Sequence, residues 1–256
     1  MRRRVRRPLS EFGHLRLRWR RLGAEGDVYM TQVAEGLSVA PPGITAPSRR
    51  HQIADWLREQ IVKGNLAPGA QLKQDILAAH LSTSPGPVRE ALRQLESEGL
   101  VQHIPNRGVF VNSVSADELL GVLLPVRLAI ESFAIAKIGR NPQTIAQLEQ
   151  LVMLMDQAAE RNDLDLLNEL DVSYHEIIVR SAHSEHALQL WASVQPRIRM
   201  QIHRLAKRHT SPFAIPQEHR VLLDSIRGDD SENLRLALDD HIMTSARDLL
   251  AREDSS

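Results

Sequence analysis

The strongest constraint on the fold is a helical pattern that occupies residues 115–252 almost without interruption. Apolar side chains recur there at the spacing of buried helix faces, and Ser115 with Glu118 forms a capping-box sequence. Gly139 and Gly228 mark helix ends. About six helices are expected, over roughly 115–137, 142–160, 163–181, 184–207, 211–228 and 230–252. Since no strand pattern intervenes, this part of the chain is predicted to be an all-α helical bundle.

The preceding segment, residues 49–111, has a different pattern. Helices are predicted over about 49–63, 74–80 and 85–98. Two β-rich runs then flank the turn sequence Pro105-Asn106-Arg107-Gly108, which is typical of a small hairpin. Three helices followed by a hairpin predict a winged helix-turn-helix, so the chain is expected to be mainly α with two domains.

Residues 1–48 are expected to form an extension and lead-in without a fold of their own. The first 29 residues hold nine arginines and three acids, and residues 36–47 are rich in proline and glycine. One interpretation is a disordered arm that binds DNA phosphates. The other is that translation begins at Met30 and the arginine-rich stretch is not part of the protein.

The formal net charge of zero conceals an uneven distribution. Residues 49–111 hold eight basic and six acidic side chains, whereas residues 112–256 hold 15 basic and 22 acidic ones. A basic N-terminal part joined to an acidic C-terminal part suggests two different tasks.

Composition excludes several classes of protein. The chain has no cysteine, which excludes a disulfide scaffold, a thiolate zinc finger, an iron–sulfur site and a thiol nucleophile. No unbroken run of 18 apolar residues suggests a membrane span. The low aromatic content, 4%, disfavours a platform that stacks single-stranded bases. A cytoplasmic protein without a membrane partner is expected.

The predicted third helix is the candidate for reading double-stranded DNA. In a winged helix-turn-helix the N-terminal end of this helix enters the major groove, and its free N–H groups suit a phosphate. A basic wing tip suits a phosphate or the minor groove. The candidate contacts are Ser84, Gly86, Arg89, Arg93, Arg107 and Gly108. The alternative is an interaction module whose arginines are only solvated.

Residues 49–111 carry a dense set of motifs that resembles the GntR family of bacterial transcription regulators. The motifs are Pro68-Gly69, Pro87-Val88-Arg89-Glu90-Ala91-Leu92, Glu98-Gly99-Leu100-Val101 and Pro105-x-Arg107-Gly108-x-Phe110-Val111. The resemblance implies binding to an operator. One position departs from the family, which usually has a base-reading arginine directly after Ser84, where this chain has Pro85. The operator sequence of relatives therefore does not transfer.

One set of side chains in the helical region suits a metal. Asp171 and His175 are four residues apart, so they share a helix face, and His219 and His241 lie on the last two predicted helices. Three imidazoles and a carboxylate suit zinc, nickel, copper, manganese or iron. The alternative is that these are ordinary polar residues, since Asp-x-x-x-His is common on solvated helices.

The layout of the helical region resembles the FCD-type ligand domain of the FadR branch of GntR regulators. That resemblance implies a divalent metal held by Asp171, His175, His219 and His241, and a small carboxylate effector anchored beside it. Arg127 with Glu131 matches the family's Arg-x-x-x-Glu, and Arg127 is the candidate anion clamp, with a structural ion pair as the alternative. Weaker candidates for contacts to the effector are Arg197, Arg199, His203 and Arg204.

These observations predict a ligand-responsive DNA-binding regulator, a repressor of a metabolic operon, and not an enzyme. It is expected to be a homodimer, because helix-turn-helix proteins of this kind read paired half-sites. The second hypothesis is a metal-dependent enzyme acting on small acids and fused to a winged helix, although no general base stands out beside the predicted metal. A third is a structural interaction module without a metal.

Overall fold

The structure is a computed structural model, and it describes residues 15–21, 28–34, 48–138, 141–228 and 230–254. Two compact units are present, residues 1–47 and 48–256. In the first unit, β1 (Leu15–Arg21) and β2 (Val28–Ala34) pair antiparallel. We did not predict these strands, although apolar residues and arginines alternate over 15–20, which is a strand pattern. The remaining residues of 1–47 lie outside the described residues.

The winged helix-turn-helix is confirmed for the N-terminal part of the second unit. Its elements are α1 (Arg49–Val62), α2 (Gln74–His80), α3 (Pro85–Ser97), β3 (Val101–Ile104) and β4 (Gly108–Val111). The strands β3 and β4 pair antiparallel from Val101 opposite Val111 to Ile104 opposite Gly108. The core between the helices and the hairpin is apolar, with Leu57, Val88 and Leu95 fully buried.

The helix starts of this domain lack the usual side-chain caps. Ser48 and Ser84 stand at the N-cap positions of α1 and α3, but neither side chain bonds the helix backbone there. The Ser48 hydroxyl instead pairs with the ring of His51 at 2.8 Å. Ile76 is exposed, because α2 buries only Leu77 and Ala78.

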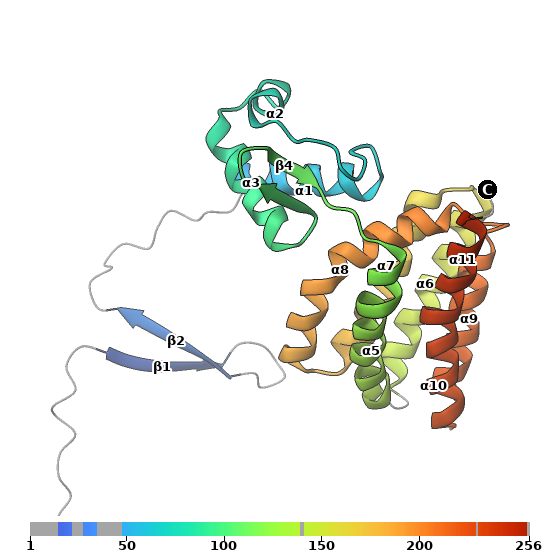
Figure 1. The fold of residues 1–256 in the computed structure, drawn as a ribbon. Coiled ribbons are helices and arrows are strands. Elements are labelled where there is room, and N and C mark those ends of the chain that lie inside the picture. The colour runs from blue at the N-terminus through green and yellow to red at the C-terminus, as the bar shows by residue number, and fades with distance from the viewer. Residues whose placement is uncertain (1–14, 22–27, 35–47, 139–140, 229, 255–256) are drawn as a thin grey trace, which may run out of the picture. The chain divides into compact units, whose positions relative to one another are not determined.

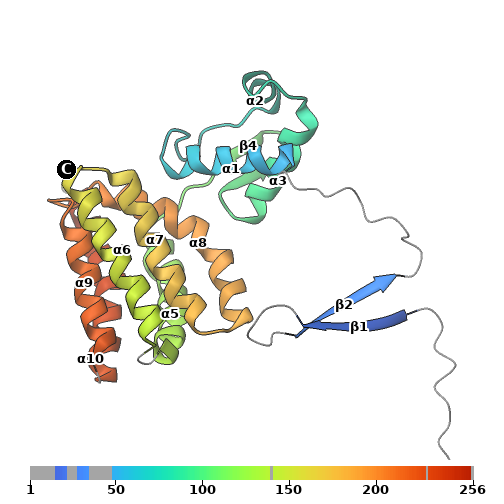
Figure 2. The ribbon, with the colours of Figure 1, turned by 180° about the vertical axis from the view of Figure 1, so that it is seen from behind.

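The second part of this unit is the expected helical bundle (Figure 1), and its helices lie side by side in both views (Figure 2). Its described residues form six continuous helices. Two of the six are interrupted by π-helical turns. The elements are α4 (Ala116–Glu118), η1 (Leu119–Leu123), α5 (Leu124–Ile138), α6 (Pro142–Glu160), α7 (Leu164–Ser181), α8 (Glu185–Ala206), α9 (Ala214–Arg227), α10 (Ser231–Asp239), η2 (Asp240–Thr244) and α11 (Ser245–Asp254).

The first of these continuous helices, Ala116–Ile138, is long and apolar enough to cross a membrane by length and composition. A single such helix is weak evidence, because core helices of soluble proteins pass the same test. It packs against α7 and α8 and carries the buried charged residues Arg127 and Glu131. The capping box predicted at its start is present, with Ser115 and Glu118 bonding each other's backbone N–H.

Candidate metal centre and cavity

Three elements bring the predicted metal ligands together. Asp171 and His175 project from one face of α7, whose start is capped by the side chain of Asp163. His219 comes from the middle of α9, and His241 lies in the π-helical turn η2. A π turn shifts side chains relative to a regular helix and occurs often at functional sites, so η2 sets the direction of His241.

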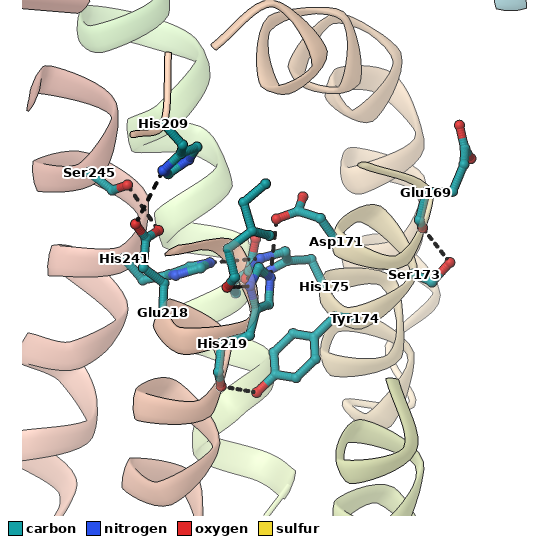
Figure 3. A network of polar contacts seen from close by, with 12 residues as sticks. Glu169, Asp171, Ser173, Tyr174, His175, His209, Glu218, His219, His241 and Ser245 are labelled. Atoms are coloured by element: carbon teal, nitrogen blue, oxygen red, sulfur yellow. Dashed lines mark hydrogen bonds and ion pairs between the residues drawn. The ribbon is translucent and has the colours of Figure 1, made fainter. Parts of the chain in front are cut away.

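The four side chains form one compact cluster (Figure 3). Their candidate ligand atoms all lie within 4.8 Å of one another. Nε2 of His175 is 3.0 Å from Nε2 of His241, and Nε2 of His219 is 3.1 Å from Oδ1 of Asp171. The predicted grouping of Asp171, His175, His219 and His241 is therefore a feature of the structure.

Hydrogen bonds on the outer side of two rings orient their inner nitrogens. Nδ1 of His175 lies 2.6 Å from Oε2 of Glu131, and Nδ1 of His219 lies 2.8 Å from the carbonyl oxygen of Ile215. Both partners are acceptors, so each ring carries its proton on Nδ1 and leaves the Nε2 lone pair toward the cluster. Carboxylate and carbonyl partners of this kind orient metal-ligating histidines in proteins.

Burial sets the protonation of the cluster. Burial, helped by the positive charge of Arg127, lowers the pKa of His175, and burial together with the neighbouring histidines lowers the pKa of His241. Burial alone would raise the pKa of Asp171, but the close contact of its carboxylate with the His219 ring and the positive charge of Arg127 outweigh burial, and the pKa falls below its usual value. Neutral imidazoles beside an ionised carboxylate are the forms that bind a metal.

Atoms without a partner also fit a bound cation. Among the described residues, Oδ2 of Asp171, Nε2 of His219 and Nδ1 of His241 are buried without a hydrogen bond. Buried polar atoms are rarely left unsatisfied, and a cluster of them is explained by an ion or water. Three nitrogens and one oxygen suit a divalent transition metal such as zinc, nickel, manganese or iron.

A cavity opens onto the cluster, and Arg127 lines it. The Nε of Arg127 donates to Oε1 of Glu131 at 2.7 Å, while Nη2 of the same guanidinium is buried without a partner. The ion pair predicted as the alternative is therefore present, and the unpartnered nitrogen leaves a donor for the predicted anion clamp. Glu131 joins Arg127 to His175, and thus joins the candidate anion clamp to the candidate metal centre.

The cavity also contains polar residues that sequence reasoning missed. They are Asn168, Gln201, His209, Glu218 and Ser245. Burial raises the pKa of Glu218, which accepts a hydrogen bond from the Ser245 hydroxyl at 3.0 Å. Only Asn168 left a usable signal, because it lies three residues before Asp171 and thus on the same helix face.

The weaker candidates of α8 do not line this cavity. Arg199 pairs with Glu59 of α1 at 2.8 Å and with Glu169 of α7. His203 contacts Asn168, and the side chain of Arg197 lies 3.0 Å from the position that a Cβ on Gly99 would occupy. We therefore do not place these arginines at an effector.

The predicted DNA-contacting residues lie at the surface. Arg89, Arg93 and Arg107 are exposed; Arg93 pairs with Glu90 at 2.9 Å and Arg107 lies over the ring of Phe110. Gly86, in the first turn of α3, has nothing within 4 Å of where a Cβ would stand, and Ser84 precedes it in an extended conformation.

Gly108 is needed for the shape of the wing, whatever it contacts. Its φ is +102°, in the region that L side chains rarely adopt, and a Cβ would lie 3.2 Å from the amide nitrogen of Gln71. The same amide donates to the carbonyl oxygen of Arg107 at 2.7 Å, so the turn that carries Arg107 is fixed from two sides.

A winged helix-turn-helix followed by a helical domain with an internal polar cavity defines a two-domain regulator of transcription. Family profiles agree with this class. Residues 49–111 match the bacterial regulatory proteins of the gntR family, and residues 122–244 match the FCD domain. The chain belongs to the GntR family and carries an FCD domain.

Curated relatives are transcriptional regulators. The gluconate operon transcriptional repressor of Bacillus licheniformis is 28% identical over 188 residues, covering 71% of this chain and 76% of the relative. The galactonate operon transcriptional repressor of Escherichia coli K12 is 27% identical over 224 residues, covering 79% and 97%.

Solved structures share the fold. A GntR regulator from Rhodococcus sp. RHA1 superposes with a TM-score of 0.68 at 25% identity, covering 80% of this chain and 99% of that one. E. coli McbR/YncC gives a TM-score of 0.65 at 23% identity, covering 81% and 100%, which shows the fold alone.

Proposed function

We propose that this protein is a cytoplasmic repressor of a sugar-acid operon, released from or held on its operator by a small carboxylate that binds at a metal in the helical domain. The observation that carries the proposal is the cluster of Asp171, His175, His219 and His241. It borders the same cavity as Arg127, whose Nη2 has no partner.

The DNA-binding half of the proposal rests on the surface of the winged helix. The first turn of α3, with Ser84 and Gly86, approaches the DNA backbone, while Arg89 and Arg93 reach the major groove. The wing carries Arg107 to a phosphate or the minor groove. A homodimer would place two such surfaces on the paired half-sites of an operator.

The sensing half rests on the cavity. Asp171, His175, His219 and His241 would hold a divalent metal, which supplies a positive centre for an anion in an otherwise acidic domain. Glu131 keeps His175 oriented and aligns Arg127, whose unpartnered Nη2 donates to the carboxylate of the effector. The apolar walls exclude water and strengthen both contacts.

The class of effector is suggested by relatives. The gluconate and galactonate repressors are named for operons of sugar acids, which are carboxylates with several hydroxyl groups. A ligand that binds the DNA-competent and DNA-incompetent forms with different affinity would shift the population between them.

Elemental analysis combined with operator binding tests the proposal. We expect one divalent metal per chain, and loss of that metal in Asp171→Ala and His219→Ala, with His186→Ala as a control because His186 is exposed on α8. Gluconate or galactonate should change operator affinity only in metal-loaded protein. Unchanged metal content in both variants would refute the ligand set, and turnover of either acid would favour the enzyme hypothesis.

A further inference from the structure

The cavity is lined by two further polar side chains that the proposed metal and Arg127 do not use, Asn168 and Gln201. Oδ1 of Asn168 and Oε1 of Gln201 are buried without a hydrogen-bond partner, and both residues line the cavity. Their residues are 3% and 4% exposed. Two unsatisfied amide oxygens in one cavity are costly, at about 1–3 kcal/mol each, unless a ligand or water donates to them.

The orientation of the Asn168 amide follows from its other atom. Nδ2 of Asn168 lies 2.9 Å from Nδ1 of His203, a ring nitrogen that accepts when the proton is on Nε2. Burial lowers the pKa of His203, which keeps the ring neutral with a single N–H. The amide nitrogen is therefore committed to His203, and the oxygen is the atom left for the cavity.

From His203 the polar contacts continue out of the helical domain. Nε2 of His203 lies 3.6 Å from Oδ1 of Asp165, and Oδ2 of Asp165 lies 3.0 Å from Nζ of Lys63, directly after helix α1 of the winged helix-turn-helix. Asp165 and Asn168 belong to the first turns of α7, the helix that also carries Asp171.

A second link joins the same two helices. The guanidinium of Arg199 contacts Glu59 of α1 at 2.8 Å and also Glu169 of α7, next to Asn168. Met200 of α8 packs into the hydrophobic core of the winged helix. The start of α7 is thus fixed to the DNA-binding domain on one side and faces the cavity on the other.

We propose that Asn168 recognises a hydroxyl group of the effector and transmits its presence to α1 through His203, Asp165 and Lys63. This inference rests on the proposed function and specifies it. The effector is a hydroxylated carboxylate, whose carboxylate lies at the metal and Arg127 and whose hydroxyl donates to the amide oxygens of Asn168 and Gln201. A plain carboxylate has no donor for those oxygens and leaves them unpaired.

Matched acids test the recognition. Titration calorimetry on metal-loaded full-length protein should give tighter binding of gluconate than of hexanoate, and of lactate than of propionate, by about tenfold or more. Asn168→Leu should remove most of the difference within each pair, because only the amide of Gln201 then remains to accept from the hydroxyl. Equal binding of the paired acids by the wild type, or no loss in Asn168→Leu, would overturn the inference.

Variants outside the cavity test the transmission. In Lys63→Met and Asp165→Asn, gluconate should bind as in the wild type, but its effect on the dissociation constant of operator DNA selected in vitro should fall from about tenfold to less than about threefold. Lys73→Met is the matched control, since it removes a lysine of the same domain for which the described residues provide no ion pair; its response to gluconate should stay at the wild-type value.

The outcomes distinguish a failure of the proposed function from a failure of this inference alone. If no acid binds wild-type, metal-loaded protein, the proposed function fails and this inference fails with it. If acids bind but the pairs are not distinguished, only the role of Asn168 fails. If Lys63→Met responds to gluconate like the wild type, the route through His203 and Asp165 is refuted, and this holds even where Asn168→Leu does not fold.

Discussion

The winged helix and the helical domain differ in where they keep their polar side chains. Among the described residues, all ten buried polar or charged side chains lie in the helical domain and none lies in residues 49–111. They are Arg127, Glu131, Thr144, Asn168, Asp171, His175, Gln201, His203, His219 and Ser225. The arginines offered to DNA are instead exposed on α3 and on the wing.

This difference indicates where each domain performs its task. A buried polar group costs free energy unless it is paired, so a domain that only presents a surface has no reason to bury one. The winged helix follows that rule with an apolar core under an exposed basic face. The helical domain buries a connected set of charges, which agrees with the proposed binding of ligands inside it.

The largest expected effect comes from cutting the buried ion pair. Glu131→Ala leaves the charge of Arg127 unpaired in the core and should destabilise the metal-free protein by about 3–5 kcal/mol. Glu176→Ala is the matched control, because Glu176 pairs with Arg180 at the same helical spacing but at the surface, where such a pair contributes about 0.3–0.5 kcal/mol. Urea unfolding measures both, and equal losses would remove the contrast between interior and surface.

Acid sensitivity should come from the helical domain. Burial lowers the pKa of His175, His203, His209 and His241 below the value of about 6.5 that each has when unfolded. Below that pH the unfolded chain takes up protons that the folded chain refuses, so stability is retained above about pH 6.5 and lost as pH falls.

The size of that loss follows from linkage. Each histidine that stays unprotonated in the folded chain contributes up to about 1.4 kcal/mol for every pH unit below about pH 6.5. Unfolding free energies of chelator-treated protein between pH 7.5 and 5.5 measure the slope. His241→Gln should flatten it by about one histidine's share; an unchanged slope would show that His241 protonates in the folded state.

The sequence predicted the helices and strands of both domains better than it predicted which side chains meet. The winged helix and the six helices followed from periodicity, because local spacing and turn residues determine both. Asp171 and His175 shared a face by spacing alone, whereas their meeting with His219 and His241 depends on how three helices pack, which only the family resemblance supplied. Asn168 was missed because its one signal, the three-residue spacing to Asp171, is not a motif by itself.

Substitution of a single exposed arginine should have a smaller effect than loss of the buried ion pair. The effect should fall on operator binding and not on stability. Arg89→Ala removes an exposed guanidinium of α3 and should weaken operator binding by about 1–3 kcal/mol, a factor of roughly 5 to 150. If Arg89 contacts a phosphate, the salt dependence also falls by about one ion. Fluorescence anisotropy at several salt concentrations measures both. Arg180→Ala, in the helical domain, should leave operator affinity unchanged; a similar loss there would place DNA contacts outside the winged helix.

The smallest expected effect is a gain in operator affinity, whereas the substitution in the core is expected to cause a loss of stability. Glu90 pairs with Arg93 on the exposed face of α3, so Glu90→Ala should leave stability within about 0.5 kcal/mol of the wild type. It frees Arg93 and removes a negative charge near the DNA backbone, and operator affinity should rise about twofold to threefold. A double-mutant cycle with Arg93→Ala separates the two contributions, because only the release of Arg93 disappears in that background. A loss of stability comparable to that of Glu131→Ala would mean that the winged helix, too, depends on its ion pairs for folding.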